Sequence, residues 1–184
     1  MDTPIKIYPH SQEAEEAVLG NILIDGASIF EKCNAWIRNE NAFYYEKNKI
    51  LWKAMANMHR EGEHIDIVTI GERIKDLRQI NENNGLDLYY ITGLPETVPS
   101  TSRAEEYAKI VWEKYIKRQS IKSAHKLYTT GFEKQDEKVE TLLHEHSRLI
   151  AELLEIAPSR KKEIGSVIND TIDTLKTGKN IIKF

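Results

Sequence analysis

The stretch Val139–Ile156, VETLLHEHSRLIAELLEI, decides the fold of this chain of 184 residues. Its seam positions are separated by alternating steps of three and four residues, the spacing that keeps side chains on one face of a helix packed against another helix. Leu143 and Ile150 widen this face on one side. The pattern predicts a long amphipathic helix with a seam at Val139, Leu142, His146, Leu149, Leu153 and Ile156.

A second long helix is predicted immediately upstream, from about Ala104 to Thr130, with an apolar stripe at Tyr107, Val111, Tyr115, Ala124 and Tyr128. The connection Gly131–Lys138 is short and polar, so the two helices must run antiparallel as a helical hairpin. One hairpin buries only one seam, and other helices are needed to cover the remaining apolar surface of the two helices. We therefore expect the chain to associate with itself through the hairpin. Subunit contacts are expected at Val139, Leu142, His146, Leu149 and Leu153.

The remaining periodic segments also predict helices. Ser11 and Asp66 are expected to cap two of them, and Ser102 and Glu105 have capping-box spacing at the start of the upstream hairpin helix. The predicted fold class is all-α, with a small helical bundle over residues 1–100, a long antiparallel hairpin over 101–156, and a linker with a docking helix over 157–184. The helices expected in the bundle lie near Ser11–Leu23, Ser28–Arg38, Glu46–Arg60, Asp66–Leu77 and Leu88–Leu94.

The character of the sequence changes after the hairpin. Ala157–Lys162, APSRKK, is typical of a linker, and a short helix is predicted near Ser166–Lys176. An isolated helix of this length is only marginally stable in water, so we expect it to dock on another surface. We interpret the chain as a fragment of a longer protein, with the docking surface in the missing part or in another subunit. The expected docking residues are Ile168, Ile172 and Leu175.

Composition narrows the functional class. Hydrophobic residues make up 40% of the chain and charged residues 30%, as in a water-facing globular protein of one or two small domains. The net charge of −3 argues against nonspecific DNA binding as the main activity. Cys33 is the single cysteine and cannot form an internal disulfide, which is compatible with a cytoplasmic location. No apolar run is long enough to span a membrane.

The sequence predicts no catalytic, cofactor-binding or metal-binding residues in this chain. Gly178-Lys179 is followed by Asn180 instead of Ser or Thr, and Asp173 stands where a phosphate-binding loop needs its first glycine. His144 and His146 are two residues apart on a helix and do not face one metal site. His146 is expected to be a core or interface histidine of the seam.

Several short motifs in order resemble the opening of DnaB-type replicative DNA helicases. The resemblance covers most of the chain up to about residue 115, and the chain has Asn48 where the family often has histidine. The motifs are Pro9-His10-Ser11, Glu13-Ala14-Glu15, Val18-Leu19-Gly20, Phe43-Tyr44, Ile65-Asp66-Ile67-Val68-Thr69, Pro99-Ser100 and Tyr107-Ala108 with Ile110-Val111.

The resemblance implies a noncatalytic N-terminal region of a hexameric replicative helicase. In that family hairpins pair between subunits, so that dimers, or a trimer of dimers, form one tier of the hexamer. Primase, and in some members a helicase loader, binds this tier. ATP, Mg²⁺ and most DNA contacts would belong to the motor domain, and the linker helix would dock on the neighbouring motor. The alternative is a free-standing helical adaptor or helicase-binding regulator.

Overall fold

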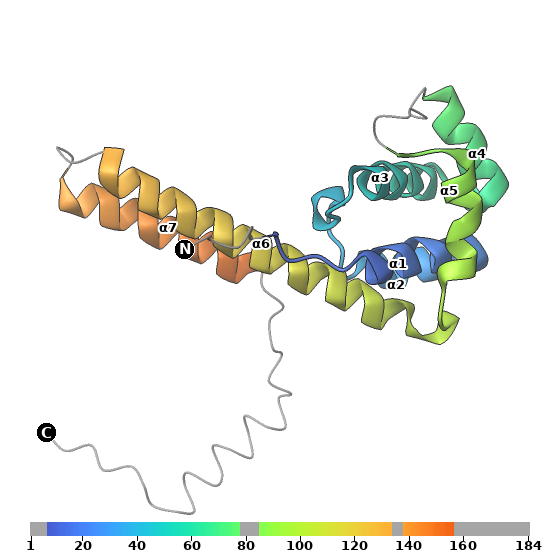
Figure 1. Cartoon of the computed structure of the whole chain (residues 1–184), viewed down its shortest axis with the longest axis horizontal. Helices are drawn as coiled ribbons and strands as arrows, with labels where there is room; N and C mark the ends of the chain where they lie inside the picture. The colour runs from blue at the N-terminus through green and yellow to red at the C-terminus, as the bar shows by residue number, and fades with distance from the viewer. Residues whose placement is uncertain (1–6, 78–84, 134–137, 157–184) are drawn as a thin grey trace, which may run out of the picture.

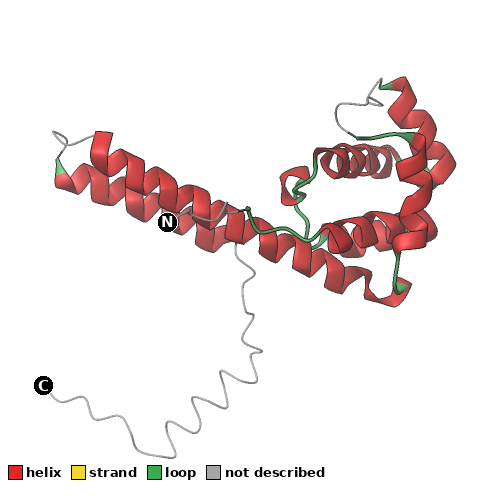
Figure 2. Cartoon of the chain, in the orientation of Figure 1, coloured by secondary structure: helices red, strands yellow, loops and turns green. Residues whose placement is uncertain are grey.

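The computed structural model describes residues 7–77, 85–133 and 138–156, and the regular elements in these ranges are helices (Figures 1 and 2). The predicted all-α fold class is confirmed. A bundle of short helices lies at one end, and a long two-helix hairpin extends away from it. The helices are α1 (Gln12–Asp25), α2 (Ala27–Asn34), α3 (Glu46–Glu61), α4 (Ile67–Asp76), α5 (Leu88–Gly93), α6 (Ala104–Glu133) and α7 (Val139–Ile156), with short 3-10 turns η1 (Glu40–Ala42), η3 (Leu94–Thr97) and η4 (Thr101–Arg103).

Helix α1 is the central element of the bundle and is buried on most of its sides. It begins at the predicted cap, where the Ser11 hydroxyl accepts a hydrogen bond from the backbone N–H of Ala14 at 3.3 Å. It ends at Gly26, whose φ of 65° lies in the left-handed region that residues with a side chain rarely adopt. The cap and this glycine together fix the length of the helix.

Gly20 allows another part of the chain to cross α1 at close range. A Cβ atom at this position would collide with the carbonyl oxygen of Leu94 and would come within 2.7 Å of a methyl group of Val98. These residues belong to η3 and the turn after it, which lie across α1. The glycine of the Val18-Leu19-Gly20 motif is therefore needed for packing.

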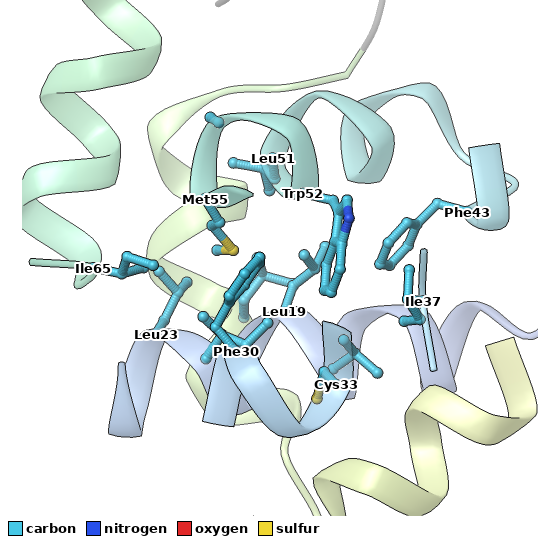
Figure 3. Close-up of a cluster of buried hydrophobic side chains, with 14 of the residues drawn as sticks. Leu19, Leu23, Phe30, Cys33, Ile37, Phe43, Leu51, Trp52, Met55 and Ile65 are labelled. Carbon is cyan, nitrogen blue, oxygen red and sulfur yellow. The ribbon is translucent and has the colours of Figure 1, made fainter. Parts of the chain in front are cut away.

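The core of the bundle is built around the aromatic side chain of Trp52 (Figure 3). Its ring lies 5.0 Å from the ring of Phe30 and 5.4 Å from that of Phe43, between centroids. Cys33 is fully buried in the same cluster, and burial raises the pKa of its thiol to about 12. A thiol that stays protonated in an apolar cluster has a packing role.

Helix α4 begins at the second predicted cap. The Asp66 carboxylate accepts hydrogen bonds from the backbone N–H groups of Val68 and Thr69, both at 2.8 Å. The Thr69 hydroxyl in turn accepts one from the backbone N–H of Asp66 at 3.0 Å, which completes a capping box. The Ile65-Asp66-Ile67-Val68-Thr69 motif is thus the start signal of this helix.

The first part of α6 belongs to the bundle. Ala104, Ala108, Val111 and Trp112 are members of its core cluster, so the core extends past the boundary expected at residue 100. The capping box expected from Ser102 and Glu105 does not form, because η4 precedes α6 without a break. Glu105 instead accepts a hydrogen bond from the indole Nε1 of Trp36 at 2.9 Å. This contact holds the start of α6 against the segment that follows α2.

Candidate interaction surface of the hairpin

Arg118 anchors the base of the hairpin to the bundle. Its side chain is buried and donates hydrogen bonds to the carbonyl oxygens of Pro9 at 2.8 Å, Ala42 at 2.5 Å and Asn41 at 3.4 Å. Burial lowers the pKa of the guanidinium group, although the carboxylate of Glu15 nearby acts in the opposite direction. Because its donors are occupied by main-chain oxygens, we assign Arg118 a structural role.

Glu15 is the second buried charged residue at this junction. Its carboxylate accepts hydrogen bonds from the backbone N–H of Tyr44 at 2.7 Å, the backbone N–H of Tyr45 at 3.4 Å, and the Asn48 side chain at 2.9 Å. Desolvation nevertheless raises its pKa above the ordinary value. The amide oxygen of Asn48 also accepts a hydrogen bond from the Tyr90 hydroxyl at 2.6 Å. The network holds the start of α3 on α1.

Two contacts set the alignment of α6 and α7. Near the tip, the Lys126 ammonium group lies 3.5 Å from the Glu145 carboxylate. At the base, the indole Nε1 of Trp112 donates a hydrogen bond to the carbonyl oxygen of Ile156 at 3.1 Å. The end of α7 is thereby fastened to the part of α6 that belongs to the bundle.

The expected seam is used mainly inside one chain. Leu149 is 9% exposed, and Leu142, His146 and Leu153 are half-buried, on the side of α7 that faces α6. Val139, at the tip, is exposed. Four of the five residues expected at the subunit interface therefore close the hairpin, and their role between subunits stays a prediction.

A second set of apolar side chains remains exposed on the hairpin. On α7, Leu143, Ile150 and Leu154 are 60%, 51% and 70% exposed. On α6, the predicted stripe is divided, because Val111 is buried in the bundle whereas Ala124 and Tyr128 are exposed. Side chains this apolar at regular helical spacing form a candidate binding surface. We call it the apolar face, and its members are Ile121, Ala124, Tyr128, Leu143, Ile150 and Leu154.

The sequence predicted this face only in part. Leu143 and Ile150 were expected to widen the seam, whereas Leu154 was not singled out, although it follows Leu153 as Leu143 follows Leu142. The sequence did contain a signal for this face, namely a second row of apolar residues that each follow a seam residue by one position. The expected docking residues Ile168, Ile172 and Leu175 lie outside the described residues. None of the described helices combines the length and apolar character needed to cross a membrane.

The sequence model of the DnaB-like helicase N terminal domain matches residues 7–113. The chain belongs to this family. Replicative DNA helicase DnaB of Geobacillus stearothermophilus is 31% identical over 176 residues, which is 96% of this chain and 37% of the relative. Replicative DNA helicase DnaC of Bacillus subtilis is 30% identical over 172 residues, or 93% and 37%. The chain thus spans little more than a third of the length of these relatives.

Two solved structures have the same fold. The N-terminal domain of DnaB helicase from Mycobacterium tuberculosis matches with a TM-score of 0.69 and 23% identity, over 79% of this chain and 99% of that one. A DnaB-like replicative helicase, described together with its interactions with primase, matches with a TM-score of 0.63 and 21% identity, over 89% of this chain and 35% of that one. The predicted resemblance to DnaB-type helicases is confirmed.

Proposed function

We propose that this chain is the noncatalytic N-terminal region of a hexameric replicative DNA helicase, and that it mediates ring assembly during DNA replication. The apolar face of the hairpin carries this proposal. It projects on a helix pair that Arg118 and Trp112 fasten to the bundle, so hydrogen bonds set the direction of the face. A fixed, exposed apolar surface is typical of an assembly interface.

In this proposal the hairpins pair between subunits to form dimers, and three dimers form one tier of the ring. ATP hydrolysis, Mg²⁺ binding and most DNA contacts belong to a motor domain in the remainder of the full-length protein. The short length of the chain relative to its matched relatives supports this division of labour. The protein acts in the cytoplasm, where replication takes place.

Primase is the proposed partner of the assembled tier, and a helicase loader is a further one. The solved helicase of the same fold was described with its primase interactions, which supports the first assignment. The segment with Ile168, Ile172 and Leu175 is proposed to dock on the neighbouring motor domain, an assignment that rests on the sequence pattern.

Sedimentation of the 184-residue chain and of the full-length helicase tests the assembly role. We expect concentration-dependent self-association, and we expect Ile150→Asp to reduce it because a charge is placed in an apolar contact. Ala151→Asp is the matched control, since Ala151 is exposed and lies one residue further around α7. A wild-type chain that stays monomeric while the full-length protein forms hexamers would contradict assembly through the hairpin.

Calorimetry with the primase from the same genome tests the partner. The wild-type assembly should bind primase, and variants that cannot assemble should bind it more weakly if the site needs more than one subunit. Absence of binding to the full-length hexamer would contradict primase as the partner.

A further inference from the structure

We propose that a cavity between the bundle and the base of the hairpin binds an acidic segment of a partner protein at its lysine and tyrosine side chains. The cavity has a volume of about 480 Å³, which is within the usual range of ligand sites. It shares no residue with the apolar face. The inference therefore goes beyond the assembly role, and the two can be tested separately.

Three separate parts of the chain form the walls of the cavity. The segment before α1 contributes Tyr8, and η1 with the turn that follows it contributes Asn41, Phe43 and Tyr44. Arg118 of α6 donates hydrogen bonds to carbonyl oxygens of both parts, and the segment before α1 lies beside α6 in Figure 1. The α6 side chains recur every three or four residues, so they share one face of the helix. They are Tyr115, Arg118, Gln119 and Lys122.

Two lysines bring positive charge to the cavity, and none of the described residues that line it carries a carboxylate. Lys122 on α6 is exposed and forms no ion pair with another residue in the described part of the chain. Lys49 on α3 lies 2.9 Å from the carboxylate of Glu46, an exposed pair of the kind that contributes little. The carboxylate of Glu15 acts on Arg118 but does not line the cavity. A carboxylate from another molecule would supply the counter-charge.

The three tyrosines add neutral hydrogen-bond donors. The hydroxyl groups of Tyr8, Tyr44 and Tyr115 form no hydrogen bond with another described residue. A phenolic hydroxyl can donate to a carboxylate oxygen, and such charge-assisted bonds are stronger than neutral ones. Lysine ammonium groups and tyrosine hydroxyls together can therefore hold two neighbouring carboxylates.

The tyrosine rings favour a peptide over a nucleic acid. The ring of Tyr44 stacks on His10 with centroids 4.3 Å apart, and Tyr115 packs on Trp112 at 5.0 Å. The guanidinium carbon of Arg118 lies over both tyrosine rings, 5.8 Å from each centroid. Bases of a single strand bind by stacking on open aromatic faces. Here a base would have to displace a contact within the chain.

The charge around the cavity also favours a peptide. A second hollow borders the cavity, and both are lined by Asn41 and Lys49. This hollow includes Glu40 and Glu46 as well as Lys53, so the positive charge does not continue in its direction. A nucleic acid strand carries a phosphate on every nucleotide and needs a basic groove along its length. A peptide needs carboxylates only at the residues that enter the cavity.

A peptide array tests the ligand class with the 184-residue chain. The array holds hexapeptides with blocked ends, two adjacent aspartates or glutamates at the centre, and varied residues on either side. The peptide that gives the strongest signal is then labelled and titrated by fluorescence anisotropy. We expect saturable binding that weakens as salt is raised, and no binding when asparagine or glutamine replaces the two acidic residues. No saturable binding by any acidic peptide would overturn the proposal.

Substitutions test whether the peptide occupies this cavity. Lys122→Ala and Lys49→Ala should each raise the peptide's dissociation constant about fivefold, because each removes one ion pair. Tyr115→Phe removes a hydroxyl and keeps the ring, and should raise it about threefold. Lys117→Ala is the matched control, since Lys117 is exposed on α6 but does not line the cavity. Equal effects of Lys117→Ala and Lys122→Ala would mean attraction to surface charge in general and would contradict the site.

A labelled thymidine oligonucleotide provides the nucleic acid arm of the experiment. The oligonucleotide should not depend on Lys49 and Lys122. If it binds more tightly than the acidic peptide and is weakened by both lysine substitutions, the cavity takes phosphates and the peptide assignment is wrong.

Sedimentation of the chain with both Lys49→Ala and Lys122→Ala separates this inference from the proposed function. We expect self-association equal to that of the wild type together with weakened peptide binding. A chain that binds the peptide but does not assemble would refute the assembly role alone, and a chain that assembles but binds no acidic peptide would refute this inference alone.

Discussion

The bundle and the hairpin are both helical, but they differ in how fully a single chain buries their apolar side chains. In the bundle, large residues such as Trp52, Phe30 and Phe43 are at most 2% exposed. In the described part of the hairpin beyond Arg118, Leu149, at 9% exposed, is the one buried hydrophobic residue. The core of the bundle is therefore filled by a single chain, whereas the described part of the hairpin leaves a row of apolar side chains for another molecule.

Stability and assembly therefore depend on different parts of the molecule. Substitutions in the bundle should lower the free energy of unfolding of the chain itself. Substitutions on the apolar face should leave that free energy nearly unchanged and act on assembly. A substitution in the seam between α6 and α7 should affect both, because the apolar face exists only while the hairpin is closed.

The largest effect is expected from Trp52→Ala in the bundle. Removal of a fully packed indole leaves a cavity between Phe30 and Phe43, and such changes cost about 3–5 kcal/mol. Urea unfolding of the chain measures the loss. Tyr89→Ala is the control, since Tyr89 is 86% exposed and should change the free energy of unfolding little. Equal effects of the two variants would contradict the division between a sealed core and an open surface.

A pair of neighbouring substitutions should separate the seam from the apolar face. Leu149→Asp places a charge in the seam, which costs about 2–3 kcal/mol, and should open the hairpin. Ile150→Asp should leave the monomer's free energy of unfolding within about 0.5 kcal/mol of the wild type, because Ile150 is exposed.

Both variants of this pair should lose self-association, so hydrogen exchange is the measurement that distinguishes them. Amides of α7 should exchange faster in the Leu149→Asp monomer than in the Ile150→Asp monomer. The same exchange rates in both monomers would mean that the seam does not close the hairpin.

The sequence predicted the helices well because their start and stop signals are local. Ser11 and Asp66 cap helices as expected, and Gly26 ends α1 close to the expected position. The periodicity of Val139–Ile156 likewise predicted α7 and its partner, since helical spacing is set by the backbone.

The candidate surface was harder to predict because it depends on which partner each stripe meets. The seam of α7 was expected to take part in the hairpin and in subunit contacts. The structure places it on the side that faces α6 of the same chain, and its role between subunits stays a prediction. Val111 and Tyr128 were expected on one stripe, but the bundle buries the first and leaves the second exposed. A helix of 30 residues can change neighbours along its length, and its sequence alone does not indicate where this happens.

The buried network at the base of the hairpin gives a smaller, pH-dependent effect. Burial raises the pKa of Glu15 in the folded chain above its value in the unfolded chain. The folded state then holds the proton more tightly, so Glu15's contribution to the free energy of unfolding should fall as pH rises from the ordinary glutamate pKa through the raised one.

Glu15→Gln should remove this part of the pH dependence, because an amide does not titrate. Thermal unfolding of the chain at several pH values, from the ordinary glutamate pKa upward, is the measurement. Glu13→Gln provides the control, since Glu13 is exposed on the same helix. A wild type and a Glu15→Gln variant with parallel pH profiles would contradict the effect of burial on this carboxyl group.

The smallest effect is expected at the cap of α4, on the surface of the bundle. Asp66→Ala removes the acceptor of two backbone hydrogen bonds and should cost about 1 kcal/mol, whereas Asp66→Ser should retain most of the cap. Hydrogen bonds from Thr69 and Val68 lower the pKa of Asp66, so the wild-type cap is effective above the ordinary aspartate pKa and weakens as pH falls through the lowered one. Chemical denaturation at neutral and acidic pH should therefore show that the difference in the free energy of unfolding between the wild type and the Asp66→Ala variant shrinks in acid.

Self-association should be the same in the wild type and the Asp66→Ala variant, because α4 belongs to the bundle and the apolar face belongs to the hairpin. A change in the dimer dissociation constant on Asp66→Ala would mean that the bundle also takes part in pairing.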